Sequence, residues 1–282
     1  MSQFQLFNGV FHPTDEALLS VNNRGFTYGD GFFESMRVSN GKAPLINGHW
    51  QRLERVTSFM RISIAPELNL RSFNQFALQL AGKNGYSNAR IRFQGYRIGA
   101  GKYTPEESKL GWCMICEPNE ESYYSLNKKG LRLDVCKSHV INPAPQSSFK
   151  TSNSLPYVLG GIYAKENGLD DCFLIDGKGN VAEATGSNVF LVKENMLITP
   201  DLVSGGVGGV MRSLVMQEAS AVGLSVNAKT ITREDILNAD ECFLTNASTG
   251  IQWVGAVGKK RYFKRAASKL TEHINAKFDL VN

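Results

Sequence analysis

The chain has 282 residues, of which 42% are hydrophobic and 20% charged, a composition typical of an ordinary globular protein. Its net charge of +5 comes from interspersed signs, without the clustered basic face that nucleic-acid binding requires. No apolar run approaches a membrane span, and the N-terminus MSQFQLFNG lacks a signal pattern. We therefore expect a cytoplasmic protein with neither nucleic acid nor membrane as a partner.

The first part of the chain predicts strands and two helices. FQLFNGVF and FFESMRV read as short strands on either side of the turn-rich VNNRGFTYGDG. GHWQRLERVTSFMRI has apolar residues at helical spacing, and RSFNQFALQLAGKNG reads as a second helix that ends at a glycine. Strands follow at ARIRFQGYRI and GWCMICEP.

A polar segment then separates two regions of mixed secondary structure. PNEESYYSLNKKG has no apolar periodicity, so we expect domains at 1–118 and 130–282, joined by a linker at 119–129. In the second domain LRLDVCKSHV, DCFLID, NVAEA, NVFLVKEN and MLITP read as strands. Helices are expected at SLVMQEASAVG and from about Lys264 onward. The predicted fold class is α+β, with two domains and a cleft between them.

Cysteine and histidine patterns do not predict a metal site. Five cysteines fit reduced thiols, and Cys113 and Cys116 read as part of a buried strand because no second cysteine pair completes a zinc site. The four histidines are scattered without metal-ligand spacing; they are His12, His49, His139 and His273. No GxSxG or Walker loop is present in the sequence.

Two segments can carry chemistry, although each also has an ordinary structural interpretation. SGGVGGVMRSL leads into a helix whose backbone N–H groups can bind a phosphate, or it is only a flexible loop before a helix. Lys150, in PQSSFKTSNSLPY, is either a solvated surface charge or an amine nucleophile close to the start of the next helix.

Two charged residues are similarly open to two interpretations. Glu183, in GNVAEATGSNVF, is a turn or edge residue or the acid partner of a buried cation. Arg52, in HWQRLERV, is a solvated helix arginine or an anion clamp.

Together these segments resemble the class IV family of pyridoxal-phosphate enzymes, which contains branched-chain aminotransferases, D-amino-acid aminotransferases and 4-amino-4-deoxychorismate lyases. Six pieces match in family order over roughly residues 8 to 254: NRGFTYGDGFFESMRV, HWQRL, FKTSN, GNVAEATGSNVF, GGVGGVMR and FLTNASTGIQWV. The resemblance implies the two-domain fold type IV architecture, with pyridoxal 5'-phosphate in the cleft between the domains. It also implies a homodimer in which a loop of one subunit lies near the other's pocket.

The resemblance also implies roles for individual residues. Lys150 would form a Schiff base with the cofactor and move the α-proton, and Glu183 would pair with the protonated pyridine nitrogen. Arg52 would bind the phosphate, and Asn188 would lie in the same pocket. The remaining phosphate contacts would come from Gly209, Val210, Met211, Ala247 and Ser248. The substrate side would use Tyr28, Phe33, Arg92 and Arg97.

Within the family, the resemblance favours the lyase, an enzyme of folate biosynthesis. Asn153 three residues after the lysine, GxMR at the helix start and TN before the last phosphate turn resemble the lyases. D-amino-acid aminotransferases have a tyrosine at the position of Phe33, and branched-chain enzymes have a tyrosine at the position of Leu155. One departure is Glu34, where lyases often have threonine.

The alternatives are a class IV aminotransferase and a non-catalytic binding protein on the same fold. The aminotransferase would act on branched-chain or other amino acids with 2-oxoglutarate. The binding protein predicts a lost lysine or phosphate cradle, and the sequence retains both.

Overall fold

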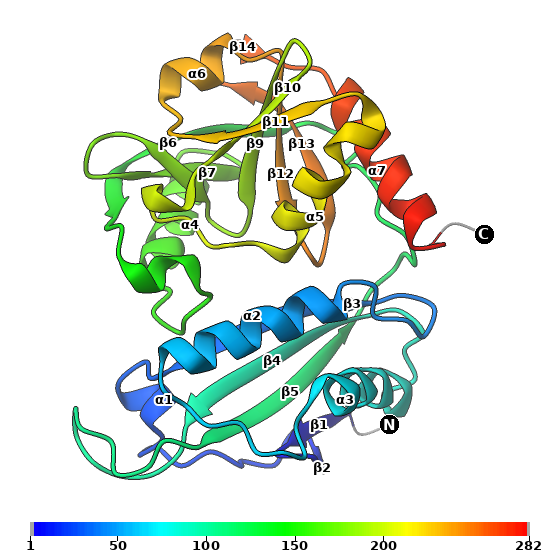
Figure 1. The fold of residues 1–282 in the computed structure, drawn as a ribbon. Coiled ribbons are helices and arrows are strands. Elements are labelled where there is room, and N and C mark those ends of the chain that lie inside the picture. The colour runs from blue at the N-terminus through cyan, green and yellow to red at the C-terminus, as the bar shows by residue number, and fades with distance from the viewer. Residues whose placement is uncertain (1–2, 281–282) are drawn as a thin grey trace. The chain divides into compact units, whose positions relative to one another are not determined.

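A computed structural model describes residues 3–280, apart from the side chain of His139 (Figure 1). The chain forms two compact units. Unit 1 comprises Met1–Ser122 and Phe149–Asn153, and unit 2 comprises Tyr123–Ser148 and Ser154–Asn282. A short segment that includes Lys150 therefore belongs to unit 1, although the chain on both sides of it belongs to unit 2.

Unit 1 contains a five-stranded antiparallel sheet in the order β2-β1-β5-β4-β3. The first two strands form a hairpin because Asn8 and Gly9 both adopt positive φ, which a two-residue type I′ turn requires. The sheet strands are β1 (Phe4–Phe7), β2 (Val10–Pro13), β3 (Gly31–Val38), β4 (Ala89–Arg97) and β5 (Leu110–Pro118). The helices are α1 (Arg24–Thr27), α2 (Ile46–Phe59) and α3 (Leu70–Lys83).

The core of unit 1 lies between one face of this sheet and helices α2 and α3 (Figure 1). Alternate residues of the strands point into it, among them Phe32 and Phe93, and Leu53 and Phe73 meet them from the helices. Each large apolar side chain buried there contributes about 1.5–3 kcal/mol. The opposite face of the strands carries Phe33 and Gln94, because successive side chains of a strand alternate between the two faces of the sheet.

Unit 2 contains a nine-stranded mixed sheet, in the order β11-β10-β9-β12-β13-β6-β7-β8 with β14 paired to β13. Its strands are β6 (Leu131–Ile141), β7 (Asp171–Asp176), β8 (Val181–Ala184), β9 (Asn188–Lys193), β10 (Met196–Pro200), β11 (Ser225–Lys229), β12 (Glu241–Asn246), β13 (Gly250–Val257) and β14 (Lys260–Arg261). Its α-helices are α4 (Leu155–Glu166), α5 (Val210–Glu218), α6 (Arg233–Asn238) and α7 (Arg265–Lys277). Turns of 3-10 helix occur at Pro145–Ser148, Leu202–Ser204 and Ala219–Val222.

The expected strands of unit 2 are present, the expected helix around α5 has different bounds, and the structure adds elements that were not expected, namely β11, β12, β13, β14 and α6. The segment expected as a single helix, SLVMQEASAVG, lies partly in α5, which already begins at Val210, and its last residues form the 3-10 turn. The helix α6 was not expected; it is short and is held at its start by a capping box between Thr232 and Asp235. Within residues 3–280, no helix is long and apolar enough to cross a bilayer.

Candidate active site

The segment that carries Lys150 pairs with β3 at the edge of the unit 1 sheet. The backbone N–H of Phe33 donates to the carbonyl of Lys150 at 2.8 Å, and the N–H of Ser152 donates to the carbonyl of Gly31 at 2.9 Å. Between them, Phe32 and Thr151 form an antiparallel bridge. In this register Lys150 and Phe33 point to the same face of the sheet. The ammonium of Lys150 accordingly lies 4.6 Å from the centroid of the Phe33 ring.

Side chains on both sides of Lys150 reinforce this attachment. The ring of Phe149 packs against Phe59 of α2, with centroids 5.1 Å apart. The side chain of Asn153 donates to the carbonyl of Gly29 at 3.3 Å. Gly29 adopts φ +64°, and a Cβ there would lie 2.7 Å from the Asn153 amide oxygen, so the turn and the asparagine fit only with glycine present. Lys150 is therefore held at a defined place rather than on a flexible loop.

Arg52 lies in a buried cluster with Glu34 and His49 in unit 1. Its Nε donates to Glu34 at 2.7 Å, and its Nη2 donates to the second oxygen of the same carboxylate. Nδ1 of His49 lies 2.6 Å from that second oxygen. Burial on its own would raise the pKa of Glu34, but the guanidinium and the imidazole lower it to about 2.

Because Glu34 is ionised at neutral pH, it fixes the plane of the Arg52 guanidinium by a two-point contact. Burial lowers the pKa of His49, so its ring is neutral at that pH. Nε2 of His49 is buried and has no hydrogen-bond partner among residues 3–280. The structure thus makes Arg52 a buried, oriented cation and not a solvated helix arginine.

Glu183 lies on β8 in unit 2, where three groups donate to its carboxylate. The hydroxyl of Tyr157 lies 2.7 Å away, the backbone N–H of Val207 3.1 Å and the side-chain amide of Asn188 3.2 Å. Asn188 also donates to the carbonyl of Val207 at 2.7 Å, so it bridges β9 and the glycine-rich segment. Burial and the adjacent carboxylate raise the pKa of Tyr157, which keeps its proton on the hydroxyl and lets it act as a donor.

The glycine-rich segment before α5 is shaped by close backbone approaches. Gly209 is the N-cap of α5, and no side chain among the described residues caps this helix start. A Cβ on Gly209 would lie 1.9 Å from the Asn188 amide oxygen, and one on Gly206 would lie 2.7 Å from the carbonyl of Ala182. The first-turn N–H groups, including those of Val210 and Met211, carry the positive end of the helix dipole. This helix start can accept an anion.

The turn after β12 that includes Ala247 and Ser248 is organised by Asn246. The amide oxygen of Asn246 accepts from the N–H of Ser248 at 3.0 Å and from that of Thr249 at 2.8 Å. The carbonyl of Ala247 accepts from the hydroxyl of Tyr124 at 3.1 Å. The backbone of the turn is thereby fixed, and its expected phosphate contacts stay a prediction.

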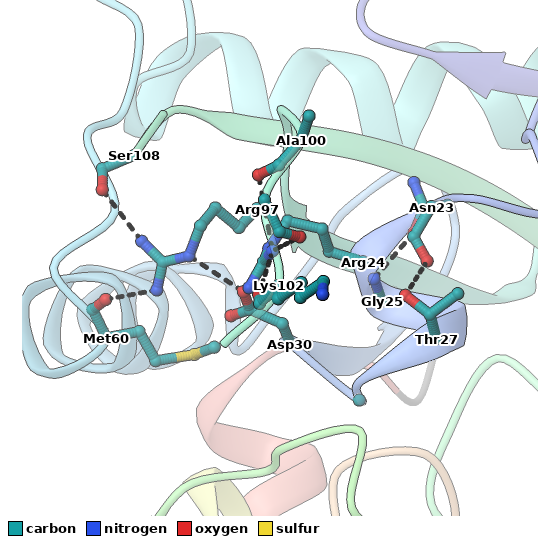
Figure 2. Close-up of polar contacts among 12 residues, drawn as sticks. Asn23, Arg24, Gly25, Thr27, Asp30, Met60, Arg97, Ala100, Lys102 and Ser108 are labelled. Atoms are coloured by element: carbon teal, nitrogen blue, oxygen red, sulfur yellow. Dashed lines mark hydrogen bonds and ion pairs between the residues drawn. The ribbon is translucent and has the colours of Figure 1, made fainter. Parts of the chain in front are cut away.

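Arg97 takes part in a buried ion cluster with Arg24 and Asp30 (Figure 2). Nε of each arginine donates to the same Asp30 oxygen at 2.9 Å. Arg97 also donates to the carbonyl of Met60 at 2.7 Å, and Arg24 donates to the carbonyl of Gly101 at 2.8 Å. These contacts tie the loop after β4 to the turn before β3, and the expected substrate contact by Arg97 stays a prediction.

Arg92 differs from Arg97 because it lies on the face of the sheet that carries Phe33 and Lys150. Its guanidinium carbon is 4.0 Å from the centroid of the Phe33 ring. Burial and the neighbouring Arg90 lower the pKa of Arg92, which is the situation that an incoming anion relieves. Phe33 thus contacts two cations, and Tyr28 packs separately against Tyr103, with ring centroids 5.7 Å apart and ring planes inclined by 57°.

Two features that sequence reasoning did not identify belong to these clusters. Tyr157 on α4 is one of them, because only the folded chain brings its hydroxyl to the carboxylate of Glu183 on β8. Gln94 is the other, and its separation of two residues from Arg92 in a strand indicates that the two side chains share a face of the sheet.

No group of three or more metal-ligating side chains occurs among residues 3–280, and the histidine at 139 has a side chain outside that description. Cys113 and Cys116 are half-buried free thiols on β5.

Comparison with known proteins identifies the family. The model of amino-transferase class IV matches residues 31–257, so the chain belongs to that family. A relative described as a putative branched-chain-amino-acid aminotransferase from Methanocaldococcus jannaschii is 30% identical and covers 96% of this chain and 93% of its own length. An aminodeoxychorismate lyase from Bacillus subtilis is 28% identical, with 85% of this chain and 82% of the relative covered.

Solved structures show the same fold. A branched-chain aminotransferase from Thermoproteus uzoniensis superposes with a TM-score of 0.88 at 21% identity, covering 99% of this chain and 95% of that one. A 4-amino-4-deoxychorismate lyase from Pseudomonas aeruginosa gives a TM-score of 0.82 at 27% identity, covering 98% and 99%. The predicted fold type IV architecture and family are confirmed. The protein is a pyridoxal-phosphate-dependent enzyme.

Proposed function

We propose that the protein is a 4-amino-4-deoxychorismate lyase that releases pyruvate and 4-aminobenzoate. The observation that carries the proposal is the segment after the lysine, where Asn153 is fitted against Gly29. Branched-chain enzymes of the family resemble one another in a glycine-rich stretch and a tyrosine there, whereas this chain has KTSNSL. The 27% identical lyase structure, matched over nearly its whole length, supports the same choice.

The residues fit pyridoxal 5'-phosphate as the cofactor. The buried carboxylate of Glu183, supported by three donors, suits a protonated ring nitrogen. The helix start at Gly209 and the oriented guanidinium of Arg52 suit a phosphate. Lys150 supplies the amine. The bound cofactor supplies an electron sink that stabilises negative charge on the substrate carbon.

In the proposed reaction Lys150 removes the proton from the substrate carbon that bears the amino group. The bond between the ring and the enolpyruvyl oxygen then breaks, the ring becomes aromatic, and the released enolpyruvate takes up a proton to give pyruvate. No keto acid is consumed. Arg92, on the same sheet face, would bind a substrate carboxylate.

A class IV aminotransferase is the second candidate, and a specific observation favours it. The relative from Methanocaldococcus jannaschii, at 30% identity over 96% of this chain, is described as a putative branched-chain aminotransferase. Lys150 would remove the same proton in that reaction and would return it to a different carbon, so the two activities share their first step.

The products decide between the two. We expect the purified protein to convert 4-amino-4-deoxychorismate into equal amounts of 4-aminobenzoate and pyruvate in the absence of any keto acid. Rapid 2-oxoglutarate-dependent transfer from branched-chain amino acids, with no lyase turnover, would instead establish the aminotransferase.

The resemblance to the family also leads us to infer a homodimer that binds a small amino-acid-like substrate. Light scattering of the purified protein measures the mass directly. A mass near twice 31.1 kDa is expected, and a stable monomer with full activity would refute the inference.

A further inference from the structure

Gln94 lies beside Arg92 on the face of the unit 1 sheet that carries Lys150. In the register of β3 and β4 it stands directly opposite Phe33. Residues opposite one another share a face, and so do residues two apart in one strand. Lys150, Phe33, Gln94 and Arg92 therefore belong to one face of the extended sheet.

Three hydrogen bonds fix the orientation of the Gln94 side chain. Its Nε2 donates to the carbonyl of Phe32 at 3.1 Å and to the hydroxyl of Ser152 at 2.9 Å. Its Oε1 accepts from Nη2 of Arg92 at 3.2 Å. A carbonyl only accepts and a guanidinium only donates, so the amide has one arrangement that satisfies both neighbours.

The path from Gln94 to Ser152 is open because the residue between them, Gly31, has no side chain. A Cβ at Gly31 would lie 3.0 Å from the Ser152 hydroxyl oxygen and 2.6 Å from the carbonyl of Gly95. The glycine allows a side chain of β4 to reach across β3 to the segment that carries Lys150. Ser152 is two residues from Lys150 and shares its face in that segment.

We propose that Gln94 is a positioning residue that couples the guanidinium of Arg92 to the placement of Lys150. A movement of Arg92 toward a bound anion shifts the amide, and the amide cannot shift without loosening its bond to Ser152. The residue acts through its neighbours and does not itself touch the reacting atoms. The inference rests on the proposed function only in assigning Lys150 as the cofactor-bearing amine.

The first test measures cofactor attachment in the absence of substrate. Pyridoxal phosphate is added to apoprotein, its aldehyde condenses with the lysine amine with loss of water, and borohydride traps the product over time. Gln94→Leu keeps the volume and removes all three hydrogen bonds, and attachment should slow about fivefold, as expected for one net hydrogen bond. Gln79→Leu, on the exposed side of α3, is the matched control and should attach the cofactor at the wild-type rate.

A double-mutant cycle separates coupling from general damage. Ser152→Ala should slow attachment by a similar factor, and the Gln94→Leu/Ser152→Ala protein should be no slower than either single variant. The inference would be overturned if the double variant slowed attachment by the product of the two single factors, or if Gln94→Leu attached the cofactor at the wild-type rate. Gln94→Glu keeps the length of the side chain and serves if the leucine variant does not fold. It places an oxygen against the carbonyl of Phe32, so attachment should slow as well, and a wild-type rate would also overturn the inference.

Steady-state kinetics supply a readout that a purely structural role would not give. With the substrate that the product assay identifies, Gln94→Leu should raise KM through Arg92 and lower kcat through Lys150, whereas Ser152→Ala should lower kcat alone. An unchanged KM in Gln94→Leu would contradict the link to Arg92. Because attachment is measured without substrate, failure of the lyase assignment leaves the first test intact.

Discussion

Replacement of Glu34 by glutamine tests the buried cluster that orients Arg52. A pKa lowered from 4.5 to about 2 in the folded state corresponds to about 3 kcal/mol of stability at neutral pH. Removing one partner of a buried ion pair costs about 3–5 kcal/mol, so the two considerations agree. We therefore expect Glu34→Gln to lower the free energy of unfolding by about 3 kcal/mol at pH 7.

The pH dependence has a defined sign. The folded-state pKa of Glu34 lies below its unfolded value, so its stabilisation is complete above about pH 4.5 and is lost as the pH falls toward 2. Urea unfolding followed by tryptophan fluorescence at pH 7, 5 and 3 should show the wild-type protein losing stability over that range. The variant should lose less, because this group no longer titrates.

The control is Glu117→Gln on β5. Its carboxylate pairs with Arg90 at 3.2 Å, but the side chains are 61% and 44% exposed, so the pair contributes at most about 1 kcal/mol. If Glu34→Gln unfolded at the same urea concentration as this control, with the wild-type pH dependence, the account of the cluster would be refuted.

Three further substitutions test other parts of the structure. Gly209→Ala would place a carbon 1.9 Å from a neighbouring amide oxygen and should weaken cofactor binding at least about tenfold in an absorbance titration, whereas Gly161→Ala, with open space around the new carbon, should bind normally. Asp30→Asn leaves two buried guanidinium groups without their carboxylate and should lower the free energy of unfolding by about 3–5 kcal/mol; a loss below about 1 kcal/mol would contradict the cluster of Figure 2. Tyr157→Phe removes a 2.7 Å hydrogen bond to a buried carboxylate and should cost about 1.5–3 kcal/mol in chemical unfolding, and an unchanged stability would show that the bond is dispensable.

Local patterns in the sequence predicted many of the secondary elements and the candidate residues. The apolar spacing around Trp50 and Leu53 predicted α2, whereas FQLFNGVF, expected as one strand, forms a two-stranded hairpin that turns at Asn8 and Gly9. The resemblance to the family assembled Lys150, Arg52 and Glu183 into one chemical scheme. No single segment predicted a cofactor site, because each of these residues also has an ordinary structural interpretation when taken alone.

Long-range pairing explains what the sequence did not predict. The segment with Lys150 pairs with β3, more than a hundred residues earlier, so nothing near Ser152 indicates that Gln94 contacts it. The partners of Arg52 were equally hidden, since Glu34 and the helix meet only in the folded unit.

Arg97 and Arg92 have different neighbours because of their separation along β4. Arg92 and Arg97 are five residues apart in one strand, and an odd separation places two side chains on opposite faces. The two arginines therefore have different surroundings, and the expected substrate contact by Arg97 stays a prediction. Arg97 instead lies near the end of α2, where it donates to the carbonyl of Met60.

The assignment of Lys150 as the cofactor-bearing lysine can be tested directly on the purified enzyme. Borohydride reduction, digestion and mass spectrometry locate the phosphopyridoxyl group on a peptide. We expect the group on Lys150, in the peptide that contains FKTSN, and we expect Lys150→Ala protein to be colourless and inactive. Label on another lysine, or full turnover by the Lys150→Ala protein, would contradict the account.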